Sequence, residues 1–420
     1  MKAAIVVTLV MAMLTLTSCG IADRMDGGRA PGMAIALEKE RAHPEVPSGD
    51  LSELVEENTA FAFDLYRLLA ERQEGENLLY SPYSISLALA MTYAGARGET
   101  EEQMAHALRF TLPGERLHPA FNALDQELGF RLNIANVIWG QEGYAFLDTF
   151  LDTLAANYGA GLRVLDFAHA PEQSRVIIND WISQQTEGKI ENLIPQGTLD
   201  PLTRLVLTNA VYFNAAWEYP FQEKVTKDSP FTLLDGSQVV VPMMHQTESL
   251  GYAEGEGYQA VELPYDGGDM SMVIILPEGD RFDEFESTLD GDHAREIVRD
   301  LSYGQVDLTM PTFVFDSHFG LSQALGELGM PAAFSSRAAD FSGMTGSKDL
   351  FISDVFHKAF ISVDEQGTEA AAATAVEMEV GSEMLADLTV VDIDHPFIFL
   401  IRDIGTGTIL FVGRVLDPAV

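Results

Sequence analysis

The segment from Val363 to Val380 constrains the fold most, because its sequence is compatible with more than one backbone conformation. Its alanine, glutamate and methionine residues favour a helix by intrinsic propensity. From residue 368 onward, however, the glutamates fall on the odd positions 369, 377 and 379, and the even positions up to 378 are uncharged. That alternation is typical of a strand with one buried and one solvated face. A segment that can be loop, helix or strand is what a conformational switch requires.

Hydrophobic periodicity divides the rest of the chain into an early helical part and a later part that is rich in strands. Apolar residues recur at helical spacing in three predicted helices: 51–72, 84–93 and 99–109. Thr100 is the expected N-cap of the third. Alternating or continuous apolar runs predict five strands: 131–139, 239–243, 271–276, 397–401 and 408–412. The last two are separated by a glycine-containing turn and read as a hairpin. We therefore predict an α+β fold with a substantial sheet.

The amino terminus contains Cys19, the one cysteine of the chain, so no disulfide can form within the chain. An apolar run at 5–14 follows Lys2, as in a secretion signal. The sequence Leu16-Thr17-Ser18-Cys19-Gly20 resembles the lipobox of bacterial lipoproteins, in which the signal is cut before the cysteine and the cysteine is acylated. The alternative is an incidental thiol inside an ordinary signal peptide.

Three regions follow from this interpretation. Residues 1–18 are the expected lipoprotein signal peptide, and the Gly- and Pro-rich residues 19–50 are a flexible tether from lipidated Cys19. Residues 51–420 contain no comparable linker or internal repeat and form a single folded domain. The expected localisation is secretion across the inner membrane, with a lipid anchor in the membrane that holds the protein at the outer membrane or cell surface.

Charge and motifs exclude several functions. The chain has 25 Lys and Arg against 64 Asp and Glu, a net charge of −39, which opposes nucleic acid and heparin-type polyanions as partners. The chain has no nucleophile elbow, phosphate-binding loop or paired-histidine zinc motif. We expect no catalytic residue, no metal and no cofactor, and hence no enzyme.

Five separated motifs resemble those of the serpin family, the serine protease inhibitors. They are the hinge segment 365–375, Asn77–Ile85 with Gly95–Thr100, Thr208–Trp217, His357–Ala359 and His395–Asp403. The resemblance covers about residues 51–418 in order. It implies a serpin fold: a large mixed central sheet, two further sheets, about eight to nine helices and an exposed reactive-centre loop.

The resemblance also implies roles for particular residues. The loop hinge would be Glu365, Gly367, Thr368, Glu369, Ala370, Ala371, Ala372, Ala373 and Thr374. A polar cluster under the sheet, which must open for loop insertion, would contain Ser81, Ser84, Asn209 and His357, and Trp217 would lie where the loop first enters. Many family members pair the hinge glutamate with a lysine, but Thr312 occupies that position here.

The position of the bait bond is left open. Sixteen residues on from Glu365, the usual family spacing, lies Gly381, with cleavage before Ser382. A shorter loop gives Val380, and counting back from Pro396 falls near Met384 and Leu385. No Arg or Lys lies between Thr368 and Val391, which excludes trypsin-like targets and favours an elastase-like or subtilisin-like protease.

The resemblance therefore implies a suicide-substrate inhibitor that traps a serine protease, or a cysteine protease, covalently and 1:1 as a monomer. The alternative is a non-inhibitory serpin that acts as a binding or carrier module. The hinge discriminates between them, because small uncharged residues can enter a sheet, whereas bulky, charged or proline residues cannot.

Overall fold

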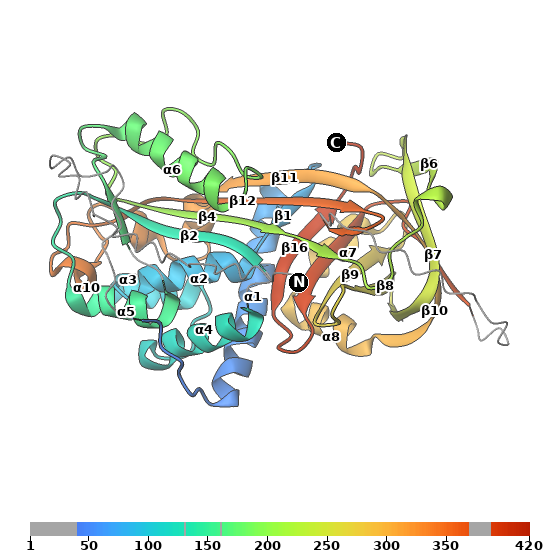
Figure 1. Ribbon diagram of the computed structural model, residues 1–420, viewed down its shortest axis with the longest axis horizontal. Helices are drawn as coiled ribbons and strands as arrows, with labels where there is room; N and C mark the ends of the chain where they lie inside the picture. Colours follow the sequence, from blue (N-terminus) through green and yellow to red (C-terminus); the bar gives the residue numbers. More distant parts are fainter. Residues whose placement is uncertain (1–39, 130–131, 160–161, 369–387) are drawn as a thin grey trace, which may run out of the picture. The chain divides into compact units, whose positions relative to one another are not determined.

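The computed structural model describes residues 40–129, 132–159, 162–368 and 388–420, all within the compact unit Gly32–Val420 (Figure 1). Cys19, the hinge positions Glu369 to Thr374 and every candidate bait residue from Val380 to Leu385 lie outside the described residues.

Ten α-helices lie in the described part of the chain, where about eight to nine were expected. They are α1 (Ser48–Arg72), α2 (Pro82–Tyr93), α3 (Gly98–Ala107), α4 (Gly114–Leu128), α5 (Asp148–Tyr158), α6 (Pro171–Gln185), α7 (Phe282–Thr288), α8 (Gly291–Asp300), α9 (Ser322–Glu327) and α10 (Ser342–Thr345). Two short 3-10 helices are η2 (Glu223–Val225) and η3 (Pro331–Phe334).

The seven-stranded sheet is the central element. Its order is β3-β2-β4-β12-β13-β5, and β11 pairs with the other edge of β12. The strands are β2 (Leu132–Gln141), β3 (Leu162–Leu165), β4 (Leu205–Phe213), β5 (Ala215–Ala216), β11 (Phe313–Gly320), β12 (Ile352–Asp364) and β13 (Gly367–Thr368). Strands β4 and β12 run parallel, although about 140 residues separate them in the sequence.

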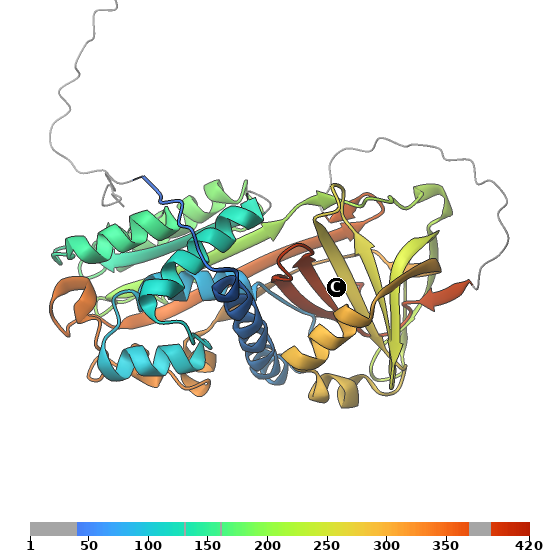
Figure 2. The same cartoon turned by 90° about the horizontal axis from the view of Figure 1, so that it is seen from below.

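The second sheet has nine strands in the order β1-β16-β15-β9-β8-β7-β10-β14, with β6 paired to β7 (Figure 2). Its strands are β1 (Leu78–Tyr80), β6 (Lys227–Thr232), β7 (Gln238–Gly255), β8 (Tyr258–Pro264), β9 (Met270–Pro277), β10 (Ser302–Pro311), β14 (Thr389–Asp392), β15 (Phe397–Asp403) and β16 (Ile409–Val415). Two separate further sheets were expected. They are continuous here because β7 is 18 residues long and pairs with β6, β8 and β10 along its length.

Strand β4 is buried along its whole length, because helices cover both faces of the sheet. In Figure 1, α6 lies over one face of β2, β4 and β12, and α2 lies on the other. Leu205, Leu207 and Val211 join the main core on the α2 side, whereas Val206 and Ala210 pack in a smaller core under α6. A continuous apolar run is what a strand covered on both faces requires.

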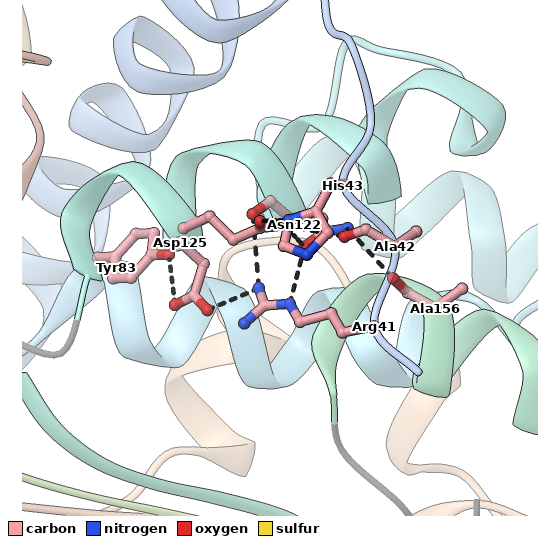
Figure 3. Close-up of polar contacts among 8 residues, drawn as sticks. Arg41, Ala42, His43, Tyr83, Asn122, Asp125 and Ala156 are labelled. Atoms are coloured by element: carbon pink, nitrogen blue, oxygen red, sulfur yellow. Dashed lines mark hydrogen bonds and ion pairs between the residues drawn. The ribbon is translucent and has the colours of Figure 1, made fainter. Parts of the chain in front are cut away.

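Two local expectations differ from the structure. Thr100 does not cap α3, which follows Arg97; its hydroxyl is buried and accepts a hydrogen bond from the backbone N–H of Asp340 at 2.9 Å. The expected domain start at residue 51 lies inside α1, which begins at Ser48. Residues 41–43, expected to be tether, pack against α4 and α5 (Figure 3).

Within the described ranges, no helix is long and apolar enough to cross a membrane. The same residues contain no group of three or more His, Cys, Asp or Glu side chains arranged to hold a metal ion.

Candidate functional site

The site is built around the seam between β4 and β12. These strands pair directly from Ile352 with Leu205 to Phe360 with Tyr212, so no other strand lies between them along this stretch. A strand that enters here must first separate the two. The seam is therefore the place where the sheet could expand.

Three polar side chains form one row across the sheet, in the middle of this seam. Asn136 on β2 is paired in register with Asn209 on β4, which is in turn paired with His357 on β12. Asn209 donates to the side-chain oxygen of Asn136, and its own oxygen accepts a hydrogen bond from Nδ1 of His357. Asn209 and His357 are fully buried, so each of these bonds replaces one lost to water.

Helix α2 begins directly under this row. Its N-cap residue is Ser81, whose hydroxyl accepts a hydrogen bond from the backbone N–H of Ser84 at 3.3 Å, and a proline follows at the first helical position. The backbone N–H of Ser81 donates to Nε2 of His357 at 3.2 Å. The hydroxyl of Ser84 accepts from Asn209, and its carbonyl accepts from Asn136 at 3.1 Å. The structure therefore brings the four predicted residues together and adds Asn136, with one helix terminus bonded to strands on both sides of the seam.

His357 is held in its neutral form. Burial lowers its pKa from 6.5 to about 3, with a smaller contribution from the charge of His318. Its ring also stacks on Phe319, with ring centroids 6.2 Å apart and planes 12° from parallel. Since Nε2 accepts from a backbone N–H, the proton lies on Nδ1, where it bonds to Asn209.

This pKa predicts a loss of stability in mild acid. A histidine whose pKa is depressed on folding contributes stability above its unfolded pKa, near 6.5, and loses that contribution as the pH falls toward 3. Between pH 7 and 5 the expected loss from His357 is about 2 kcal/mol. Buried His118, with a pKa lowered to about 4, adds a similar amount.

Urea unfolding at several pH values tests this expectation. Over this range, the decrease in unfolding free energy of the variant His357→Gln should be smaller than that of wild type by about 2 kcal/mol. Exposed His106 offers a matched control, and His106→Gln should keep the full decrease. Parallel pH profiles for wild type and His357→Gln would refute the assignment.

Two residues of the expected hinge form a short strand at one end of the seam. Strand β13, Gly367–Thr368, lies between β12 and β5 and pairs antiparallel with both. Gly367 has φ +155°, and a Cβ there would lie 2.3 Å from the carbonyl oxygen of Ala215. Only glycine fits this position, because both the backbone angle and the close approach exclude a side chain.

The side chain of the next residue, Thr368, contacts an aromatic pair. Thr368 is fully buried, and its hydroxyl lies 2.8 Å from the hydroxyl of Tyr265. The Tyr265 ring stacks on Trp217, with centroids 4.6 Å apart. Trp217 donates from Nε1 to the carbonyl of Asp364 at 3.0 Å and from its backbone N–H to the carbonyl of Gln366 at 2.9 Å. Trp217 thus fixes the backbone reversal that leads from β12 into β13.

Glu365 has a threonine partner. Its carboxylate accepts a hydrogen bond of 2.6 Å from the hydroxyl of Thr226, and its carbonyl accepts from the backbone N–H of Phe221 at 2.9 Å. Thr312, which was expected at the position of the family's lysine, donates its backbone N–H to the carbonyl of Pro242 at 3.0 Å.

Sequence reasoning missed two residues of the site, Asn136 and Tyr265. Asn136 stands in the middle of a strand of alternating apolar residues, where an amide interrupts the pattern, and that interruption was the available signal. Tyr265 directly follows a strand, and no pattern in the neighbouring sequence points to its role. Its partners Trp217 and Thr368 are 48 and 103 residues away in the sequence.

Comparisons with known proteins agree with this architecture. The sequence model of the family described as Serpin (serine protease inhibitor) matches residues 56–418. The leukocyte elastase inhibitor of Bos taurus is 41% identical over 382 residues, which cover 88% of this chain and all of that protein. An uncharacterized serpin-like protein of Thermococcus kodakarensis is 40% identical over 366 residues, covering 86% of this chain and 84% of that protein.

A solved structure shows the same fold. The thermophilic serpin tengpin in its native state superposes with a TM-score of 0.82 at 30% identity, covering 92% of this chain and all of tengpin. The chain belongs to the serpin family, and its α+β serpin fold is thereby established. The description of the matching family model names an inhibitor of serine proteases, which is not a catalytic activity.

The comparisons contradict the predicted localisation. The family model begins at residue 56, and the whole of the bovine elastase inhibitor aligns with 88% of this chain. Membership of the family therefore does not imply a membrane anchor. The lipobox-like motif around Cys19 lies outside the residues that the family model matches. Secretion with a lipid anchor at the outer membrane or cell surface was the wrong prediction, and these relatives give no support to a bacterial origin either.

Proposed function

We propose that this protein is a suicide-substrate inhibitor of a serine protease with elastase-like or subtilisin-like specificity. The nucleophilic serine of the protease attacks the bait carbonyl in the segment 369–387, the peptide bond breaks, and the amino-terminal part of the loop stays attached as an ester. Insertion of that part into the seven-stranded sheet then distorts the protease before water can cleave the ester.

The observation that carries this proposal is the closed seam between β4 and β12, with β13 already placed at its end. Because β13 runs antiparallel to both neighbours, a strand that continues from Thr368 would exchange one parallel seam for two antiparallel ones. Antiparallel pairing is slightly more stable per residue, and the added strand gains backbone hydrogen bonds on both sides. The free energy of the change therefore favours insertion once the loop is cut.

The hinge composition supports insertion rather than a carrier role. Residues 370–373 are four alanines, which add little bulk and no charge to a strand that enters the sheet. For the bait bond we propose Gly381–Ser382, with Val380, Met384 and Leu385 as alternatives. Small and aliphatic residues at these positions fit an elastase-like pocket, and the bovine relative is named for inhibition of leukocyte elastase.

The folded domain is proposed to run from residue 40 to 420, because residues 41–43 and α1 pack on it. It acts as a monomer, one chain for each protease. Residues 1–18 and 19–39 remain outside this assignment.

Mixing the full chain with an elastase and with a subtilisin tests the proposal. We expect a covalent complex that survives SDS, with the cut mapped between Val380 and Leu385, and no such complex with trypsin. Cleavage in the segment without a complex would contradict the inhibitory function and favour the carrier function.

A further inference from the structure

Two neighbouring cavities share Tyr258 in their walls. Tyr258 is the first residue of β8 and directly follows the turn that connects β7 to β8. One cavity, of about 460 Å³, lies between this turn and the helices α7 and α8. The other, of about 490 Å³, lies between the same turn, the end of β9 and His395. No described residue of the β4–β12 seam, the hinge or the polar row lines either cavity, so the two cavities form a separate site.

The ring of Tyr258 is held between the sheet and the two helices. Gly255 is its cross-strand partner, and a Cβ at that position would lie 2.3 Å from the tyrosine side chain. The ring also contacts Phe285 on α7 and His293 on α8, with ring centroids 5.4 and 5.8 Å away. Phe285 and His293 contact each other at 5.4 Å. The three rings therefore form one aromatic wall of the smaller cavity rather than a cage around its contents.

The hydroxyl of Tyr258 has no partner of its own. The residue is only 8% exposed, yet no group within the described ranges makes a hydrogen bond to its hydroxyl. Buried tyrosine hydroxyls usually have such a partner. Burial raises the pKa of this hydroxyl, and the negative charges of Asp300 and Glu296 on α8 raise it further. The hydroxyl thus lies near two carboxylates without a bond to either.

Negative charge dominates the lining of the smaller cavity. Arg281 is the one arginine or lysine among the described residues that line it, and its guanidinium is already paired with Glu284 at 2.9 Å and with Glu278 at 3.5 Å. Arg299 contacts Glu296 and Asp300 but is 68% exposed, so water screens these pairs strongly. The carboxylates that line the cavity are those of Glu254, Glu256, Glu284, Glu296 and Asp300. Their excess over the cations favours a positively charged ligand.

We propose that these cavities bind a polyamine, a ligand in which short carbon chains join several ammonium groups. An ammonium group has three N–H donors and no acceptor, so it can donate to the Tyr258 hydroxyl oxygen and to the carboxylates of Glu296 and Asp300. The carbon chain packs on the aromatic wall, where the ring faces also attract the cation. A hydrated metal ion would use the carboxylates but not this wall.

The second cavity provides a place for a second ammonium group. It shares Glu254, Gly255 and Tyr258 with the first cavity and adds the carboxylate of Glu278. A chain that passes Tyr258 can therefore place one cation on each side of the shared wall. This arrangement favours a ligand with at least two ammonium groups over one with a single group.

Calorimetric titration of the uncut full-length protein with spermidine tests the site. Physiological salt is used, because the net charge of −39 attracts any polyamine and salt screens that general attraction. We expect one binding site per chain. Tyr258→Phe keeps the ring and should weaken binding about fivefold. Asp300→Asn should weaken it about tenfold, through loss of a charge-assisted hydrogen bond.

Glu102→Gln is the matched control, because Glu102 is exposed on α3 and its substitution changes the net charge as Asp300→Asn does. It should bind spermidine as wild type does, and 1-aminobutane, with one ammonium group, should bind at least tenfold more weakly than spermidine. Equal affinities for wild type, Tyr258→Phe and Asp300→Asn, or displacement of spermidine by an equal concentration of Mg²⁺, would overturn the proposal. No protease is present, so the result does not depend on whether the protein traps one.

Discussion

Replacing Thr368 with arginine is expected to turn the protein from a trap into an ordinary substrate. Thr368 is fully buried between β12 and β5, and its hydroxyl bonds to Tyr265. An arginine at this position would face the aromatic pair of Tyr265 and Trp217, neither of which carries a charge, and leaving the cation unpaired inside the sheet costs about 3–5 kcal/mol. Insertion slows, so water has time to cleave the acyl-enzyme.

The measurement is the number of inhibitor molecules consumed for each protease trapped. A barrier of that size raises this number by on the order of a hundredfold or more. We expect the variant to fold, because β13 has only two residues and can give up its pairing while the two large sheets stay intact. The cost of burying the charge then falls on the insertion step.

Thr368→Ser is the control, since serine keeps the hydroxyl and adds no charge or bulk. It should trap protease as wild type does. Efficient trapping by Thr368→Arg would mean that a charge at the start of the inserting strand does not slow insertion.

Removing the amide of Asn209 is expected to destabilise the native state by about 3–5 kcal/mol, because three partners, two of them fully buried, lose a hydrogen bond at once. These partners are the Ser84 hydroxyl, the Asn136 side-chain oxygen and Nδ1 of His357. Each unpaired buried group costs about 1–3 kcal/mol. The midpoint of urea unfolding for Asn209→Ala measures the loss.

Asn157→Ala is the control, because it makes the same substitution of alanine for asparagine at another site. Asn157 makes one hydrogen bond of 3.0 Å to Thr153 within its own helix, so its removal should cost about 1 kcal/mol. Equal costs for the two variants would show that the polar row does not hold the seam closed.

The sequence predicts the elements of this fold better than the contacts between them. The alternating and continuous apolar runs correctly place β2, β9, β15 and β16, since periodicity reports which faces are covered. The shared serpin motifs placed Ser81, Ser84, Asn209 and His357 in one cluster, but periodicity alone could not have joined residues that are 276 positions apart.

The segment before α1 shows where local composition misleads. Residues 40–50 contain His43-Pro44 and Val46-Pro47-Ser48-Gly49, which are typical of a linker. Specific tertiary contacts outweigh this tendency: Arg41 pairs with Asp125, and Asp50 pairs with Arg116 in the first turn of α1. No local pattern reveals an ion pair with a partner more than 60 residues away.

The most direct test of loop insertion is thermal unfolding of the protein before and after a single cut within residues 369–387. If the cut loop joins the sheet between β4 and β12, the midpoint temperature should rise by roughly 20 °C or more, because a full strand of backbone hydrogen bonds is added. An unchanged or lower midpoint after a clean cut would contradict insertion, and with it the trapping mechanism.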